Sequence, residues 1–214
     1  MRTAINQYNQ ILIPVFAQQR CEDILEVLKE IGVNCPIYLD TPLGTKIYNV
    51  WNEPLDYETS IGLKIIQSWD ESLALQESNE HCVILASSGM LTAGRGVCYL
   101  KKLLLNPNNC VLFCGYSSEN TTATAIKQGN KQIKVDGELI NNNAQIYCLN
   151  TFSSHANYNQ LMEYYTNVDY DKLCLVHSDF SAKVEFCKVL QNKLVEQGKA
   201  AKVICVNEGT KIYL

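Results

Sequence analysis

The sequence predicts an α/β protein in which a mostly parallel sheet carries helices on both faces. Strand-like and helix-like segments alternate along its 214 residues, and such alternation favours parallel strands joined by crossover helices. Residues 10–17 and 82–87 are continuous apolar runs, which are typical of strands buried on both faces. Residues 20–31 repeat their apolar side chains at helical spacing, which indicates a helix with one face packed against such a sheet.

The expected elements follow one another in a regular order. Gly32 supplies a C-terminal stop for the helix at 20–31. Residues 52–80 are harder to assign and are interpreted as an acidic stretch of weak helices. The other expected elements are a strand at 36–40, a helix from 41 with Pro42 in its first turn, a strand at 82–87, a helix at 96–105, a strand at 110–115, a helix at 121–129, a hairpin turning at Asp136–Gly137, a strand at 144–149, a helix at 157–166, a strand at 172–177, a helix at 181–197 and a strand at 202–207.

The composition favours a soluble globular domain and argues against a membrane protein. Hydrophobic residues make up 47% and charged residues 19%, as in soluble globular domains. No apolar run approaches the roughly 20 residues that span a bilayer, and the first ten residues do not resemble a secretory signal. We therefore expect no membrane association.

The ten cysteines do not suggest a disulfide framework. No Cys-x-x-Cys pair occurs, which argues against a structural zinc site made of cysteines. A free cysteine in an apolar run behaves as a small hydrophobic residue, so we expect buried, reduced thiols and a cytoplasmic protein. The cysteines in or beside apolar strand-like runs are Cys82, Cys114, Cys148, Cys174 and Cys205.

Charge is unevenly distributed along the chain, although the net charge is only −4. Residues 53–80 contain seven acids and the single base Lys64, whereas residues 92–134 contain six bases and the single acid Glu119. Two solvated faces of opposite sign would explain this pattern. A phosphate-facing surface near 92–134 is the alternative.

Polar residues follow most of the expected strands, where parallel sheets place their functional groups. Ser87-Ser88-Gly89 after the strand at 82–87 offers hydroxyl and amide groups to an anion, or else forms an ordinary turn. The segments to inspect are 17–20, 40–41, 87–90, 115–118, 151–157 and 177–179.

Two histidines lie at such strand ends. His155 is placed to contact a phosphate or donate a proton. His177 is placed to ligate a metal or to fix a loop by hydrogen bonds. Taken individually, each histidine is slightly more typical of a structural role, and His81 is expected at the surface. Two histidines do not complete a catalytic zinc site, and the sequence contains no His-x-His cluster, Gly-x-Ser-x-Gly elbow or phosphate-binding glycine loop.

Six segments, in order, resemble the β-CASP family, the nucleic-acid branch of the metallo-β-lactamase superfamily. They are IPVFAQQRCEDIL (13–25), PIYLDTPLGTKI (36–47), ILASSGMLTAGR (84–95), NCVLFCGYSSENTTATAI (109–126), TFSSHANYNQL (151–161) and LCLVHSD (173–179). The resemblance implies a β-CASP domain at 1–142, with a mostly parallel sheet flanked by helices. It also implies that 143–214 form the C-terminal β-α-β-α-β portion of a metallo-β-lactamase domain whose N-terminal portion is absent.

The resemblance also implies roles for individual residues. His155 matches a family histidine that acts as an acid toward the departing oxygen, and His177 matches a zinc ligand found in the RNA-processing branch. The complete enzyme would hold two zinc ions, and this chain would bind zinc weakly or not at all. Five residues match loops that border the phosphate path: Ser87, Ser88, Gly89, Ser153 and Ser154.

The sequence departs from the family pattern in several places. Ser154 replaces a common glycine, Asn157 replaces a common aspartate, and His177-Ser178-Asp179 replaces a common His-Gly-Glu. The family's His-x-His-x-Asp-His metal cluster has no counterpart here. The chain is therefore expected to be a fragment of a longer enzyme, a separately made piece or a relic.

Three functions remain open. The first is the substrate-clamping part of a zinc-dependent ribonuclease that acts on single-stranded RNA and is inactive as this chain alone. The second is a non-catalytic nucleic-acid-binding or scaffold module of the same family. The third is an unrelated nucleotide- or phosphate-binding domain. In the first two cases, the missing portion or self-association would cover an otherwise exposed sheet.

Overall fold

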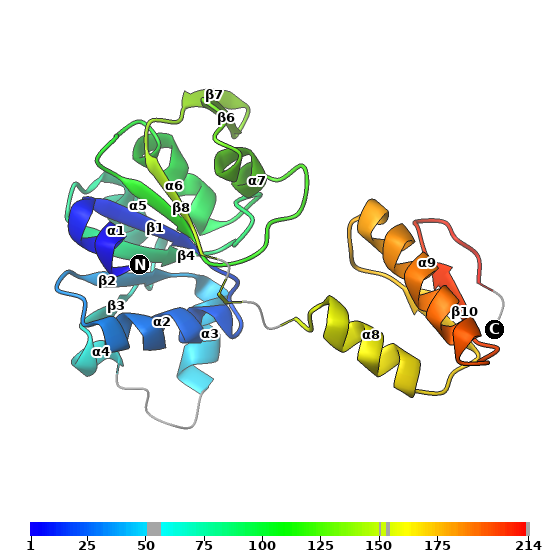
Figure 1. Cartoon of the computed structure of the whole chain (residues 1–214). Coiled ribbons are helices and arrows are strands. Elements are labelled where there is room, and N and C mark those ends of the chain that lie inside the picture. Colours follow the sequence, from blue (N-terminus) through cyan, green and yellow to red (C-terminus); the bar gives the residue numbers. More distant parts are fainter. Residues whose placement is uncertain (51–56, 150, 153–154, 213–214) are drawn as a thin grey trace. The chain divides into compact units, whose positions relative to one another are not determined.

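The computed structural model describes residues 1–50, 57–149, 151–152 and 155–212 (Figure 1). The chain divides into two compact units, Met1–Ser153 and Ser154–Leu214. No helix in the described ranges is long and apolar enough to cross a membrane. The two units are described in turn, each by itself.

A six-stranded parallel sheet forms the centre of the first unit, in the order β3-β2-β4-β1-β5-β8. The central strands β1 and β4 are buried along their whole length, as continuous apolar runs predict. The strands are β1 (Gln10–Pro14), β2 (Ile37–Asp40), β3 (Leu63–Ile65), β4 (Cys82–Ala86), β5 (Cys110–Phe113) and β8 (Gln145–Cys148).

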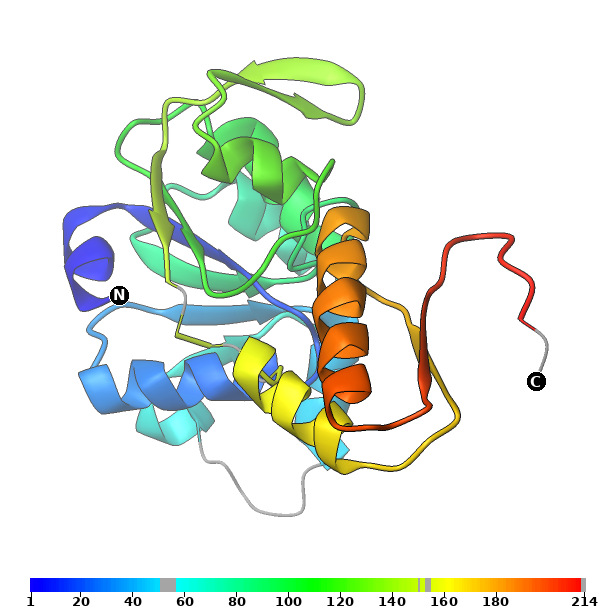
Figure 2. The ribbon, with the colours of Figure 1, turned by 45° about the vertical axis from the view of Figure 1, so that its right-hand side comes forward.

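Helices cover both faces of this sheet (Figures 1 and 2). Side chains of α1 (Arg2–Gln7), α2 (Arg20–Ile31), α3 (Pro42–Val50) and α4 (Tyr57–Ser60) pack into the hydrophobic cluster on one face. Side chains of α5 (Trp69–Glu77), α6 (Arg95–Leu103) and α7 (Thr122–Lys127) pack into the cluster on the other. The prediction of a parallel sheet flanked by helices is confirmed.

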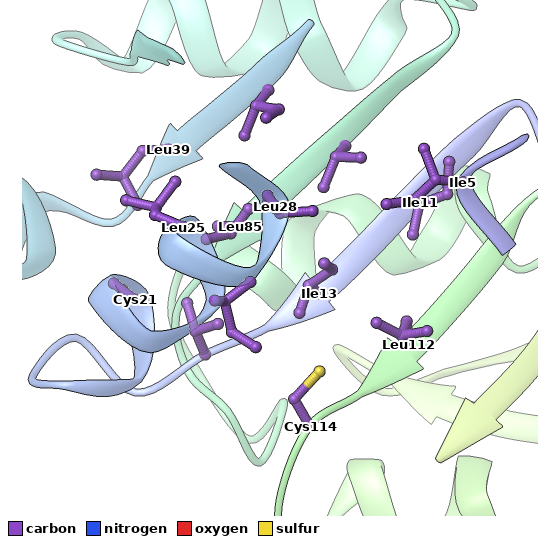
Figure 3. Close-up of a cluster of buried hydrophobic side chains, with 14 of the residues drawn as sticks. Ile5, Ile11, Ile13, Cys21, Leu25, Leu28, Leu39, Leu85, Leu112 and Cys114 are labelled. Atoms are coloured by element: carbon purple, nitrogen blue, oxygen red, sulfur yellow. The ribbon is translucent and has the colours of Figure 1, made fainter. Parts of the chain in front are cut away.

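Alternation along each strand separates the two clusters. Ile11 and Ile13 point to the cluster that also contains Leu28 of α2, whereas Leu12 belongs to the opposite cluster. Figure 3 shows the first cluster, where β1, β4 and β5 side chains meet α2. Since both faces bury apolar side chains, the central strands are apolar apart from Gln10 at the start of β1, and no polar alternation is visible in the sequence.

The predicted hairpin is also present. It consists of β6 (Gln132–Val135) and β7 (Glu138–Asn141), which pair in an antiparallel register. Asp136 and Gly137 have φ values of +49° and +88°, the left-handed pair that a tight two-residue hairpin turn requires. The hairpin therefore turns at the predicted dipeptide.

The second unit is a small β-α-β arrangement with an additional helix. It contains α8 (Tyr158–Asn167), β9 (Lys172–Leu175), α9 (Phe180–Glu196) and β10 (Lys202–Cys205), and its two strands are parallel. Its core is small, centred on Met162, Leu190 and Leu194. Val176, Phe180 and Val195 remain exposed, so this unit leaves apolar surface uncovered by its own residues.

Two sequence predictions differ from the structure. Residues 63–65 form the edge strand β3, although the surrounding stretch was expected to contain only weak helices; three residues are too few for a clear strand signal. Cys148 is exposed, and Cys174 and Cys205 are half-buried, against the expectation of buried thiols. Their strands lie at the edge of the large sheet or in the two-stranded one, where fewer neighbours cover them.

The other expected thiols are buried. All ten cysteines lie within the described residues and are free thiols. Burial raises the pKa of the Cys82 and Cys114 thiols to about 12. These two behave as small core hydrophobes, as expected from their apolar runs.

The predicted boundary between the β-CASP domain (1–142) and the metallo-β-lactamase portion (143–214) stays a prediction. In this chain, β8 pairs with β5, with Cys110 opposite Gln145. The division into compact units therefore falls after β8, between residues 153 and 154.

We predict that Leu85→Ala lowers the free energy of unfolding by about 2–5 kcal/mol, because it leaves a cavity in the fully buried central strand. Leu139→Ala makes the same change on the hairpin, where Leu139 is 66% exposed, and should cost less than about 0.5 kcal/mol. Urea denaturation of the two variants and the parent measures both values. Equal losses for the two variants would contradict the described sheet.

Candidate functional site

The parallel strands bring four polar segments to one edge of the first unit. Residues 17–20 follow β1, Thr41 follows β2, 87–90 follow β4 and 115–118 follow β5. Asp40 and Ala86 are register partners at the ends of β2 and β4. The carboxyl edge of this sheet therefore collects the segments that the strand-end rule selected.

The loop after β4 folds back tightly on itself. The Gly96 amide donates to the Ser87 carbonyl oxygen at 2.5 Å, and the Leu91 amide donates to the Ser88 carbonyl oxygen at 3.1 Å. Gly94 has a φ of +83°, and a Cβ atom there would lie 3.0 Å from the Ser87 carbonyl oxygen. Only glycine meets both conditions, so the loop from Ser87 to Gly96 has a defined shape.

The predicted residues of this loop differ in what they offer to an anion. The Ser88 amide donates to the Ala93 carbonyl oxygen at 3.2 Å, so this amide is occupied within the loop. The Ser88 hydroxyl is buried and has no hydrogen-bond partner among the described residues. Gly89 has a packing role, because a Cβ atom there would lie 2.9 Å from the Phe16 ring. Ser87 is half-exposed.

A buried carboxylate lies beside this loop. Asp40 is 1% exposed, and its Oδ2 accepts hydrogen bonds from the Tyr99 hydroxyl at 2.6 Å and the Ser72 hydroxyl at 2.5 Å. Arg95 Nε lies 3.5 Å from Asp40 Oδ1. Burial, followed by the hydrogen bond to Asp40, raises the pKa of Tyr99 well above its usual value. Asp40 thus connects β2 with α5 and α6.

Arg95 links the carboxylate to an exposed aromatic ring. Its guanidinium carbon lies 4.3 Å from the centre of the Trp69 ring, within the range of a cation–π contact. Sequence reasoning selected Asp40 but missed Ser72, Tyr99 and Trp69. Ser72 and Tyr99 lie 32 and 59 residues from Asp40 in the sequence, and Trp69 contacts Arg95 and not Asp40 itself. No local sequence pattern records such long-range contacts.

Side chains of α7 donate hydrogen bonds to the loop after β5. The Thr124 hydroxyl donates to the Ser118 carbonyl oxygen at 2.7 Å, and Thr121 caps α7 by accepting from the Thr124 amide. Lys127 Nζ donates to the Gly115 carbonyl oxygen at 2.6 Å, and burial lowers the pKa of Lys127. Thr121, Thr124 and Lys127 therefore fix the 115–118 loop by local hydrogen bonds.

The basic stretch at 92–134 is mostly engaged within the chain. Arg95 and Lys127 make the contacts described above, Lys101 pairs with Glu138 at 3.3 Å, and Lys102 pairs with Glu77 at 3.6 Å. Lys131 and Lys134 are exposed on the hairpin side. Most of the basic residues at 92–134 are thus paired within the chain and do not form a continuous basic surface.

The histidines of interest belong to the second unit. His155 and His177 are both exposed, and His177 follows β9 with a φ of +59°, a backbone conformation that residues other than glycine adopt at a cost.

Asn157 caps α8. Its side-chain oxygen accepts from the Gln160 backbone amide, and the Gln160 side-chain oxygen accepts from the Asn157 backbone amide. The residue that replaces the family aspartate therefore has a structural role.

The structure does not test the predicted roles of Ser153 and Ser154, or the predicted placement of the serine loop relative to the histidines. Ser153 and Ser154 lie outside the described residues. The serine loop and the histidines belong to different units, so their mutual arrangement stays a prediction. His81 is exposed, as expected, and its Nδ1 lies 3.1 Å from the Asn9 carbonyl oxygen.

A complete metal site does not form within the part of the chain that the structure describes. No group of three or more His, Cys, Asp or Glu side chains there is placed to hold a metal ion. Catalytic zinc typically takes three protein ligands. The described residues therefore do not fit a resident zinc ion by themselves.

The first unit is thus a parallel α/β domain, covered on both faces, whose polar loops gather at the carboxyl edge of the sheet. A Beta-Casp domain matches residues 21–126, and a Zn-dependent metallo-hydrolase RNA specificity domain matches residues 140–204. The chain belongs to the β-CASP family of metallo-hydrolases, which confirms the resemblance seen in its six segments.

Curated relatives agree with this membership. Transcription termination factor FttA of Methanocaldococcus jannaschii is 32% identical, over 88% of this chain and 34% of the relative. The factor of the same name from Pyrococcus horikoshii is 30% identical, over 78% of this chain and 30% of the relative. Ribonuclease TTHA0252 of Thermus thermophilus is 27% identical, over 89% and 48%. The chain spans about a third to a half of the length of these relatives.

We predict that Asp40→Asn lowers the free energy of unfolding by about 3 kcal/mol, because it leaves the Arg95 guanidinium without its buried counter-ion. Glu77→Gln is the matched control, since Glu77 pairs with Lys102 at an exposed position and its loss should cost less than about 1 kcal/mol. Chemical denaturation of both variants supplies the comparison. A loss for Asp40→Asn no larger than that of Glu77→Gln would mean that the buried pair does not hold this edge.

Proposed function

We propose that this chain is the substrate-clamping part of a zinc-dependent metallo-hydrolase that cleaves RNA phosphodiester bonds, and that alone it binds single-stranded RNA without cutting it. The observation that carries the proposal is the compact Ser87–Gly96 loop at the carboxyl edge of a parallel sheet, in a chain that includes an RNA specificity domain. Ligands of open parallel sheets bind at this edge.

The phosphate contacts are assigned to the serine loops. Ser87 is half-exposed at the end of β4, so its hydroxyl can donate to a phosphate oxygen. The Ser88 hydroxyl is buried beside it and lacks a partner among the described side chains, so a small local movement would give it an acceptor. Gly89 keeps the loop close to Phe16. By family resemblance, Ser153 and Ser154 border the same phosphate path.

The two histidines are assigned to the chemical step. His155 is exposed ahead of α8 and would protonate the departing oxygen as a general acid. His177 would contribute one imidazole to a zinc ion whose other ligands come from outside this chain. Of the two zinc ions expected in the complete enzyme, this chain alone would hold neither tightly, because one histidine falls short of a zinc site.

A non-catalytic nucleic-acid-binding or scaffold module of the same family is the second candidate. The specific observation in its favour is that the described side chains supply no cluster of metal ligands. Relatives that match this chain include proteins named as a transcription termination factor and as a ribonuclease, and both names fit a surface that binds nucleic acid. A cytoplasmic location is part of either proposal.

The exposed apolar residues of the second unit are proposed to contact a partner. Val176 and Phe180, four residues apart in the sequence, are exposed there, and a patch made of such residues favours contact with another surface. The partner would be the N-terminal metallo-β-lactamase portion or, without it, a second copy of this chain.

We predict that Ser87→Asp weakens the binding of a fluorescent single-stranded RNA about tenfold or more, because the new carboxylate repels phosphate at the contact. Ser60→Asp adds the same charge at an exposed position at the end of α4 and should change affinity by less than about twofold. Fluorescence anisotropy at a fixed salt concentration measures both dissociation constants. Equal weakening by the two variants would reject a contact at Ser87.

We also predict that the purified chain does not cleave single-stranded RNA in the presence of added zinc, and that His177→Ala leaves this result unchanged. The reason is that His177 alone does not make a zinc site. Gel analysis of labelled RNA over several hours gives the readout. Robust cleavage that disappears in His177→Ala would overturn the assignment of the chain as a clamp without its own metal site.

A further inference from the structure

We propose that Trp69, supported by Arg95, is a stacking platform for one unpaired base of a bound single strand. This inference rests on the proposed function and assigns a contact to the base in addition to the phosphate contacts. Trp69 is 48% exposed, although it is a large apolar residue. The Arg95 guanidinium lies 4.3 Å from the centre of its ring.

Contacts of Arg95 connect Trp69 to the candidate phosphate loop, residues 87–96. Arg95 lies between Gly94 and Gly96, and the Gly96 amide donates to the Ser87 carbonyl oxygen. Arg95 Nε also lies 3.5 Å from Asp40 at the end of β2. A strand whose phosphate contacts Ser87 would therefore have a base within reach of the Trp69 ring.

The first turn of α5, which carries the ring, is held in a defined position by its neighbours. Trp69 is the first residue of α5, and Ser68 caps this helix by accepting from the Glu71 amide at 3.1 Å. The Gln67 amide donates to the Glu71 carboxylate at 2.8 Å, and Ser72 is anchored on Asp40. A platform ordered before binding loses little conformational entropy on contact.

The Arg95 guanidinium at the ring is paired with Asp40, so the remaining charge around the ring favours a base over a phosphate. Asp70 and Glu71 follow Trp69 directly, and their carboxylates repel phosphate groups. A neutral base is unaffected by this repulsion and stacks on an aromatic ring with little regard to sequence. Paired bases in a duplex present no free face, so the site discriminates against double strands.

The first test measures affinity for a short single-stranded RNA. Trp69→Ala is expected to raise the dissociation constant about 5- to 150-fold, the loss expected for one stacked base, while Trp69→Phe keeps a ring and stays within about threefold of the parent. Leu73→Ala, which truncates another exposed apolar residue of α5, should leave affinity unchanged. The dependence of affinity on salt should be the same for Trp69→Ala and the parent, because no phosphate contact is lost.

The second test uses the emission of the ring itself. The chain contains two tryptophans, Trp51 and Trp69, so the Trp51→Phe variant reports on Trp69 alone. A single-stranded oligouridylate should quench this emission, whereas an abasic oligomer of equal length or a blunt RNA duplex should not. Circular dichroism and the melting temperature verify that each variant is folded.

The outcomes separate this inference from the function on which it rests. If the parent chain binds no single-stranded RNA, the proposed function fails and this inference fails with it. If RNA binds but leaves the Trp69 emission and the Trp69→Ala affinity unchanged, only the stacking platform is overturned, and the exposed ring belongs to a protein contact instead. Quenching by the base-bearing single strand, together with loss of affinity in Trp69→Ala and retention in Trp69→Phe, supports the platform.

Discussion

The buried carboxylate of Asp40 holds together the edge of the sheet on which the rest of the site depends. It accepts hydrogen bonds from Ser72 of α5 and Tyr99 of α6, and it pairs with Arg95 at the start of α6. A buried charge is tolerated only when such partners surround it. The same pairing orients Arg95 toward Trp69 and places Gly96 where its amide reaches the Ser87 carbonyl oxygen.

This arrangement supports the proposed binding of RNA by a chain whose net charge is −4. The carboxyl edge offers the half-exposed residue Ser87 and the aromatic ring of Trp69. Four of the six basic residues at 92–134 make contacts within the chain. Binding at such an edge depends on a few shaped contacts instead of bulk attraction. In the proposed function, the second unit contributes His155 and His177, which would act together with metal ligands from outside this chain.

Most of the fold follows from local patterns in the sequence. Apolar runs predicted β1 and β4, helical spacing and Gly32 predicted α2, and Asp136–Gly137 predicted the hairpin. The strand β3 escaped notice because three residues pair only in the context of β2. Of the candidate site, Ser87 to Gly89 were predicted from their place after a strand. The partners of Asp40 were not, because hydrogen bonds between distant segments leave no periodic signal in the sequence.

The central claim is that the carboxyl edge of the six-stranded sheet binds single-stranded RNA. Photo-crosslinking of a 4-thiouridine-containing RNA, followed by mass spectrometry of the adducts, tests it most directly. The account predicts crosslinked peptides from residues 16–20, 69–72, 87–96 and 115–118, which follow or flank the carboxyl ends of the strands. Crosslinks confined to 106–109 and the β6–β7 hairpin, with that edge unlabelled, would contradict the account.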